Sequence, residues 1–103
     1  MKKIIQKLSP IQWGYKPRGF CPVQSEGYFL GYYFYFRGRW DIASIDFAES
    51  NNAWWDGDTL YEKVLYKTDG INDAGWMPRN QCIGLIWKGC ILFLIYQLFN
   101  IKL

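Results

Sequence analysis

The chain has 103 residues, of which half are hydrophobic and a fifth aromatic, and its formal net charge is +3. This length supports one domain with one core, and the apolar content excludes intrinsic disorder. Because the sequence contains no histidine, it lacks the commonest general base and metal ligand, which excludes Ser-His and Cys-His hydrolases. We therefore expect a single domain over residues 1–103 that is not an enzyme and needs no cofactor or metal.

Aromatic and charged residues are distributed in a way that favours binding. The 6 Trp, 8 Tyr and 7 Phe exceed what so small a domain can bury, so several should lie at the surface or against another molecule. Residues 1–20 carry five basic side chains and no acid, whereas residues 41–75 carry eight acids and two lysines. This asymmetry indicates either two solvated faces or an acidic patch that docks on a basic protein surface.

Residues 1–22 are predicted to form a basic arm followed by a loop. Three prolines and two glycines between Ser9 and Pro22 exclude regular structure of any length there. We expect Trp13, Tyr15 and Phe20 to lie across the sheet and cover it.

The sequence predicts a cytoplasmic protein. Its first residues are basic, but the apolar run before Gln6 has only two residues, too few for a secretory signal. The three cysteines are widely spaced and form no CxxC pair, which is typical of a reducing compartment.

A β-meander is predicted over residues 26–67. Its strands are Glu26–Leu30, Tyr32–Arg37, Trp40–Phe47 and Thr59–Lys67, with turns at Gly31 and near Gly38-Arg39. The segment Thr59–Lys67 also fits one face of a helix, but its Tyr, Val and Thr content favours a strand.

Side chains alternate across the strand that begins at Tyr32. Phe34, Phe36 and Trp40 fall on one face with Gly38 and are predicted to enter the core. The other face is predicted to be a wet recognition surface, and it carries Tyr33, Tyr35, Arg37 and Arg39. In the alternative interpretation, the C-terminal helix covers both tyrosines and the two arginines bridge to Asp41 and Asp46.

The segment Glu49–Asp58 is predicted to be a polar loop that exposes Trp54 and Trp55 beside Asp56 and Asp58. Asp56 and Asp58 begin as an EF-hand loop would, but Leu60 occupies the fifth position, where a calcium ligand is required. We therefore expect solvated turns here and no metal.

A C-terminal helix is predicted over residues 78–99, with Pro78 as its first residue. The run Cys90–Phe99 is apolar on every side, which fits a buried segment, a contact with another chain or part of a membrane helix. A helix buried against the sheet is favoured, although a break at Gly89 would allow an added strand. Cys82 and Cys90 would lie about 12 Å apart along the helix, too far for a disulfide, and are expected to pack in the core.

Three segments carry a resemblance to a known group of proteins. They are Cys21–Gln24 with Glu26-Gly27, Phe34–Arg39, and Gly75–Pro78. In order and spacing they resemble small uncharacterised bacterial and bacteriophage proteins with a CPVQ-EG…FYFR-R…GWMP pattern. The likeness spans roughly residues 20–80 and implies a short β-meander followed by a helix, with no known activity. The apolar tail CILFLIYQLFNIKL departs from the polar ending of that pattern.

Together these features predict an α+β domain in which an antiparallel meander of about four strands carries a C-terminal helix on one face. We expect a non-enzymatic binding protein, encoded by a phage or mobile element, that inhibits a larger host protein or ribonucleoprotein assembly, as anti-CRISPR proteins do. The alternative is a single-stranded nucleic-acid binder that uses the Tyr/Arg face. A homo-oligomer through the apolar C-terminal segment is a further expectation. The expected contacts are Tyr33, Tyr35, Arg37, Arg39, Trp54, Trp55, Asp56 and Asp58.

Overall fold

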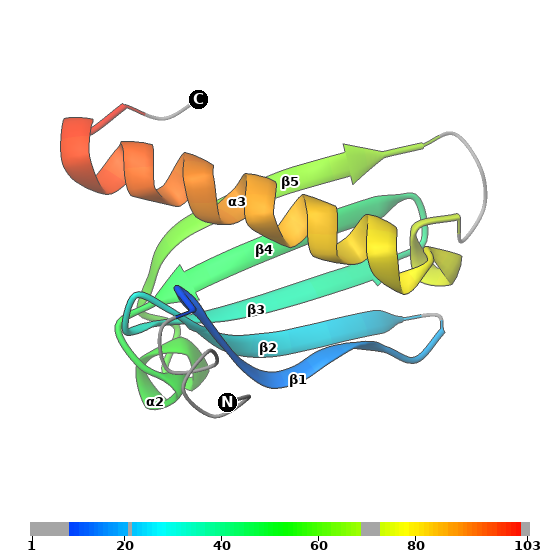
Figure 1. Ribbon diagram of the computed structural model, residues 1–103, viewed down its shortest axis with the longest axis horizontal. Coiled ribbons are helices and arrows are strands. Elements are labelled where there is room, and N and C mark those ends of the chain that lie inside the picture. The colour runs from blue at the N-terminus through cyan, green and yellow to red at the C-terminus, as the bar shows by residue number, and fades with distance from the viewer. Residues whose placement is uncertain (1–8, 21, 69–72, 102–103) are drawn as a thin grey trace.

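A computed structural model describes residues 9–20, 22–68 and 73–101. Its centre is an antiparallel sheet in which the strands follow one another in chain order, and a long helix crosses one face of it (Figure 1). The α+β class predicted from the sequence is confirmed, with five strands where about four were expected. The strands are β1 (Ile11–Arg18), β2 (Val23–Phe29), β3 (Tyr32–Arg39), β4 (Ile42–Ala48) and β5 (Thr59–Lys67). The helices are α2 (Asn51–Trp55), the 3-10 helix η1 (Asp73–Trp76) and α3 (Arg79–Phe99).

Strand β1 lies where the sequence predicted only a loop. It pairs with β2 from Ile11 opposite Phe29 to Arg18 opposite Gln24, with irregularities in register at Gly14 and before Arg18. An edge strand has one unpaired side, so it tolerates a proline such as Pro17 and can absorb extra residues in bulges. The prediction that the prolines and glycines exclude regular structure here is therefore wrong.

The two tight turns of the meander differ in how well they were predicted. Leu30 and Gly31 join β2 to β3, and both have positive φ, 50° and 87°, as the predicted turn at Gly31 requires. The next turn is Trp40-Asp41, two residues later than predicted, so β3 extends through Gly38. Trp40 therefore lies in a turn and is 56 % exposed, which corrects its placement in the core.

Gly38 is required by a close approach and not by a turn. A Cβ at this position would lie 2.3 Å from the backbone oxygen of Ala74, because η1 packs over this end of the sheet. The amide of Ala74 also donates a hydrogen bond to the carbonyl oxygen of Trp40, at 3.1 Å. Only glycine lets the two backbones meet without displacement.

The core lies between the sheet and α3. Phe34, Phe36, Ile45 and Phe47 point from the sheet toward Phe93 of the helix, and all five are essentially inaccessible to solvent. The Phe47 and Phe93 rings stack at 4.2 Å between centroids. Strand β5 occupies Thr59–Lys67 as predicted, and its Tyr61 ring completes this cluster at 5.9 Å from Phe93.

Helix α3 confirms the predicted C-terminal helix, with Pro78 one residue outside it as the N-cap. Its cysteines are buried free thiols, as the predicted packing role requires. Burial raises the pKa of Cys82 to about 11 and that of Cys90 to about 12, so both thiols stay protonated and unreactive near neutral pH.

Two glycines on α3 predict opposite responses to alanine. Around Gly84 no described atom lies within 4 Å of an added Cβ, so Gly84→Ala should raise the free energy of unfolding by about 0.5–1 kcal/mol through helix propensity. At Gly89 the added Cβ would lie 2.8 Å from Cγ2 of Ile45, a buried and branched side chain. Gly89→Ala should therefore lower the free energy of unfolding by about 1–2 kcal/mol, because overpacking exceeds the gain in helix propensity.

Urea unfolding of the two variants beside the wild-type protein measures this difference. Equal effects of the two substitutions would contradict the close contact between α3 and β4.

Candidate functional site

The sheet face opposite α3, called here the open face, has side chains arranged in rows across the strands. Directly opposed residues on neighbouring antiparallel strands point to the same side. One row is Arg39, Ile42 and Lys67, and the next is Arg18, Gln24, Arg37, Ser44 and Val64. A third row is Tyr15, Glu26, Tyr35, Asp46 and Glu62. The cations therefore occupy the first two rows and the acids occupy the third.

Tyr33 and Tyr35 lie on the face that was predicted, but they are not free. The hydroxyl of Tyr33 donates to the Glu26 carboxylate at 2.5 Å, and that of Tyr35 donates to Oε1 of Gln24 at 2.6 Å. Only 2 % of Tyr33 is exposed. Burial, with the bond to Glu26 as a second cause, raises the pKa of Tyr33 far above its usual value. The tyrosine half of the predicted recognition surface is therefore closed.

The element that covers these tyrosines is α2, not the C-terminal helix proposed in the alternative interpretation. The Trp54 ring lies 4.7 Å from the Tyr35 ring and 5.8 Å from the Tyr33 ring, between centroids. Its Nε1 donates to Oδ2 of Asp46 at 3.0 Å. Asp46 therefore pairs with Trp54 and not with the arginines, and Arg39 instead lies over the Trp40 ring at 4.9 Å.

Helix α2 replaces the polar loop that the sequence predicted over Glu49–Asp58. Ser50 caps it, since its hydroxyl accepts a hydrogen bond from the Ala53 amide at 3.0 Å. The helix ends in a turn at Gly57, whose φ is +85°. This local geometry fixes the neighbouring side chains Trp55, Asp56 and Asp58, all of them exposed, which we call the α2 tip. Trp55 is 73 % exposed, as predicted. The predicted exposure of Trp54 is wrong, because its ring packs on Tyr33 and Tyr35.

The carboxyl group of Asp46 links stability to pH. Burial is the main cause that raises its pKa above the usual value, the Trp54 hydrogen bond opposes this, and the nearby Glu62 adds to it. A raised pKa in the folded state means that the folded protein holds the proton more tightly than the unfolded chain does. The resulting stability is fully present below the unfolded pKa of about 3.9 and is lost as pH rises through the folded pKa.

Asp46→Asn should therefore be slightly more stable than the wild-type protein at pH 7, because asparagine is uncharged and still offers an oxygen to the Trp54 indole. After allowance for solvent screening we expect a rise of about 2 °C in Tm, which shrinks as pH falls toward 3.5. Thermal unfolding followed by circular dichroism measures it, with the exposed Asp58→Asn as the control. A lower Tm for Asp46→Asn at pH 7 would be inconsistent with the stated cause.

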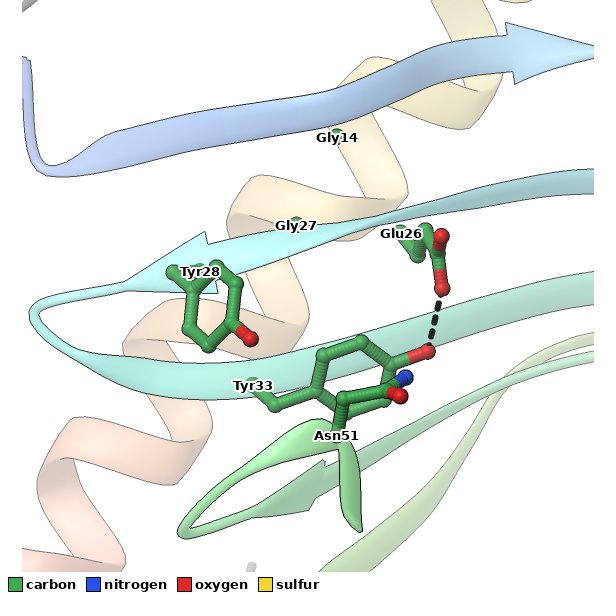
Figure 2. A pocket seen from close by; sticks show the side chains of 6 residues that line it. All are labelled: Gly14, Glu26, Gly27, Tyr28, Tyr33 and Asn51. Atoms are coloured by element: carbon green, nitrogen blue, oxygen red, sulfur yellow. Dashed lines mark hydrogen bonds between the residues drawn. The ribbon is translucent and has the colours of Figure 1, made fainter. Parts of the chain in front are cut away.

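A pocket of about 250 Å³ surrounds the Glu26–Tyr33 pair and is lined also by Tyr28 and Asn51 (Figure 2). The Glu26 carboxylate already accepts a hydrogen bond from the Tyr33 hydroxyl, and the pocket lining contains no Ser, Cys, Thr or Lys side chain. These residues were not predicted as site residues. The polar and aromatic side chains Gln24, Glu26 and Tyr28 alternate along β2. This alternation could have indicated the pocket only if the pairing of β2 with β3 had been known. The hydrogen bond from Tyr33 to Glu26 ties β3 to β2 on this face.

The outward side of α3 is a second surface of interest. Its outer stripe, defined as Trp87, Ile91, Leu94 and Leu98, follows 4-3-4 spacing, and Ile91 and Leu98 are 54 % and 67 % exposed. Among the described helices, α3 is long and apolar enough to cross a membrane by length and composition alone. Its inner side, with Cys82, Ile86 and Phe93, is part of the domain core.

Among the described residues, no three His, Cys, Asp or Glu side chains gather closely enough to hold a metal ion. No family model, curated protein or solved structure matches this chain. The resemblance to small bacterial and bacteriophage proteins therefore stays a prediction.

Proposed function

We propose that the protein is a non-enzymatic binding module that occupies a surface of a larger protein assembly, with the α2 tip as its principal contact. The observation that carries this proposal is a Trp55 that is 73 % exposed on a capped helix anchored to the sheet through Trp54 and Asp46. Tryptophan is the residue type most enriched in binding hot spots, and a rigid presentation lowers the entropic cost of binding. Asp56 and Asp58 beside it favour a basic rim around the receiving pocket.

A protein partner is favoured over single-stranded nucleic acid by the contents of the open face. Tyr33 and Tyr35, the stacking platforms of that alternative, are covered by Trp54. Glu26, Asp46 and Glu62 share one row there and would repel a phosphate backbone that crosses it. Tight binding of single-stranded DNA with a steep salt dependence would reverse this preference.

The biological role that we favour is that of a cytoplasmic inhibitor encoded by a phage or mobile element, which blocks a host protein or ribonucleoprotein assembly as anti-CRISPR proteins do. Its support is the small size of the domain, the resemblance of residues 20–80 to phage proteins, and an acidic surface around Trp55.

Removal of the Trp55 side chain tests the proposal. Trp55→Ala should weaken partner binding at least tenfold, because truncation of a hot-spot tryptophan typically costs 2 kcal/mol or more, and fold stability should stay unchanged. The matched control is Trp76→Ala, which removes an exposed tryptophan stacked on Phe20.

The measurement is quantitative capture on immobilised protein from a lysate of the host cells. A partner retained by the wild-type protein and by Trp76→Ala but lost by Trp55→Ala supports the proposal. Equal retention by the wild-type protein and both variants would show that the α2 tip is not the contact.

A second copy of the chain is a further proposed partner, through the outer stripe of α3. The stripe is apolar. Arg79 and Lys88 lie on the same helix, and residues 76–103 contain no acid with which either could form an ion pair. Spacing of this kind brings two helices together side by side, with interlocking side chains.

A further inference from the structure

Basic residues gather at one corner of the open face, at the end of the sheet away from the α2 tip. Arg37 and Arg39 are two residues apart on β3 and point to the same side, so their Cα atoms lie about 7 Å apart. Arg39 is in one row with Ile42 and Lys67, and Arg37 is opposite Ser44 in the next row. Three strands thus bring three cations and a hydroxyl group to one place.

A pocket of about 200 Å³ lies in this corner. It is lined by Arg37, Arg39, Trp40, Ile42 and Ser44, none of which is acidic. The nearest acids are Asp41, which lies between Trp40 and Ile42 in the turn but does not line the pocket, and Asp46 one row away. Oδ2 of Asp46 already accepts a hydrogen bond from the Trp54 indole. The charged side chains that line the pocket are therefore all positive.

One donor of the pocket is buried without a partner. Nε of Arg37 is inaccessible to solvent and has no hydrogen-bond partner among the described residues. An unsatisfied buried donor is costly, and folded proteins rarely leave one without a functional reason. An oxygen acceptor bound in the pocket would satisfy it only after the Arg37 side chain turns Nε outward, because water does not reach this atom in the structure.

We propose that this pocket binds a phosphate group. Two guanidinium groups and a hydroxyl supply more donors than the two oxygens of a carboxylate can accept, whereas a phosphate offers three oxygens and nearly two negative charges. Arginine forks match phosphate geometry in two-point contacts. Trp40 and Ile42 give the pocket an apolar side, against which the group that carries the phosphate can lie.

The size of the pocket limits what else it can hold. Sites for whole cofactors or drug-sized ligands usually measure about 300–1,000 Å³, so this one suits a phosphate with a small attached group. That chemistry is shared by a free phosphomonoester and by a phosphorylated side chain of a partner protein. The inference does not depend on the proposed role of the α2 tip.

Calorimetric titration at constant ionic strength tests the proposal with four probes. They are inorganic phosphate, phenyl phosphate, a phosphoserine pentapeptide and the same peptide without phosphate. We expect inorganic phosphate, phenyl phosphate and the phosphoserine peptide to bind, and the peptide without phosphate not to bind. Tighter binding of phenyl phosphate would assign the site to small molecules, and tighter binding of the phosphopeptide would assign it to a phosphorylated partner.

Arg39→Gln and Arg37→Lys should each weaken phosphate binding about tenfold or more, the second because lysine keeps the charge but loses the fork. Arg18→Gln is the matched control, because Arg18 lies in the Arg37 row at the far edge of the sheet, over the Tyr15 ring. It should bind phosphate within twofold of the wild-type protein. Circular dichroism establishes that each variant is folded, and Arg39 is exposed, so its replacement leaves the core intact.

Absence of binding by all phosphorylated probes at 10 mM, about tenfold above the 1 mM Kd of a weak site, would overturn the proposal. Equal losses in Arg39→Gln and Arg18→Gln would also overturn it, because they would show a diffuse charge effect and no defined site.

Discussion

Replacement of Phe93 by alanine is expected to lower the free energy of unfolding by about 3–5 kcal/mol. The side chain is 1 % exposed, stacks on Phe47 at 4.2 Å and meets the Tyr32 ring edge-on at 5.1 Å. These contacts join α3 to β3 and β4, so the cavity left by alanine would lie at the centre of the core. A domain of this kind has about 5–15 kcal/mol of stability in total, and one substitution would remove a large part of it.

Phe99→Ala is the matched control, because it makes the same substitution on the same helix at a side chain that is 66 % exposed. It should change the free energy of unfolding by less than about 0.5 kcal/mol. Urea denaturation followed by tryptophan fluorescence measures both variants, with an unchanged m-value as the check on two-state behaviour. If Phe93→Ala were as mild as Phe99→Ala, α3 would not pack on the sheet as described.

The division of β3 into two faces could be predicted from alternation alone. Phe34 and Phe36 face the core, and Tyr33, Tyr35, Arg37 and Arg39 face the other way. The faces of β4 were also predicted correctly although the preceding turn was misplaced. A two-residue turn that moves along the chain always shifts the register by an even number of residues, and side chains alternate with a period of two, so Ile45 and Phe47 kept their face.

Alternation along a strand cannot predict which other residues cover a face of the sheet. The exposure of Tyr33 is decided by Trp54, which is distant in sequence. Trp54 reaches Tyr33 because Ser50 caps a helix and Asp46 accepts a hydrogen bond from the indole N–H. Strand β1 was missed for a related reason. Its Pro17 and Gly14 are strong local signals against a strand, and only the pairing with β2 reveals that they lie at register irregularities on an edge.

The candidate contact residues also differ in how far local sequence could predict their surroundings. Trp55, Asp56 and Asp58 lie around the Asp-Gly turn and are exposed, so local chemistry was sufficient to predict their exposure. The pocket at Arg37 and Arg39 depends on which residue of β4 stands opposite each arginine, and that register was not available until the turn at Trp40-Asp41 was known.

The outer stripe of α3 leads to the prediction with the largest effect on the state of the protein in solution. An unpartnered apolar helix face in water favours association, because burial of apolar surface yields about 25 cal/mol per Å². We expect the wild-type protein to sediment, at tens of micromolar, with twice the monomer mass of 12.2 kDa. The double variant Ile91→Lys/Leu98→Lys should sediment as a monomer, since it places like charges opposite one another in the helix pair. Both side chains are exposed, so the monomer should remain folded.

The matched control for that variant is Leu30→Lys/Val64→Lys, which adds the same charge at two exposed apolar side chains outside the stripe. It should remain a dimer. Sedimentation equilibrium at three concentrations distinguishes the outcomes, and flotation with liposomes tests whether lipid covers the stripe instead. A wild-type monomer that stays in the soluble fraction would show that the stripe is neither a dimer contact nor a membrane contact. A dimer that persists in the α3 variant but dissociates in the control would place the contact on another face.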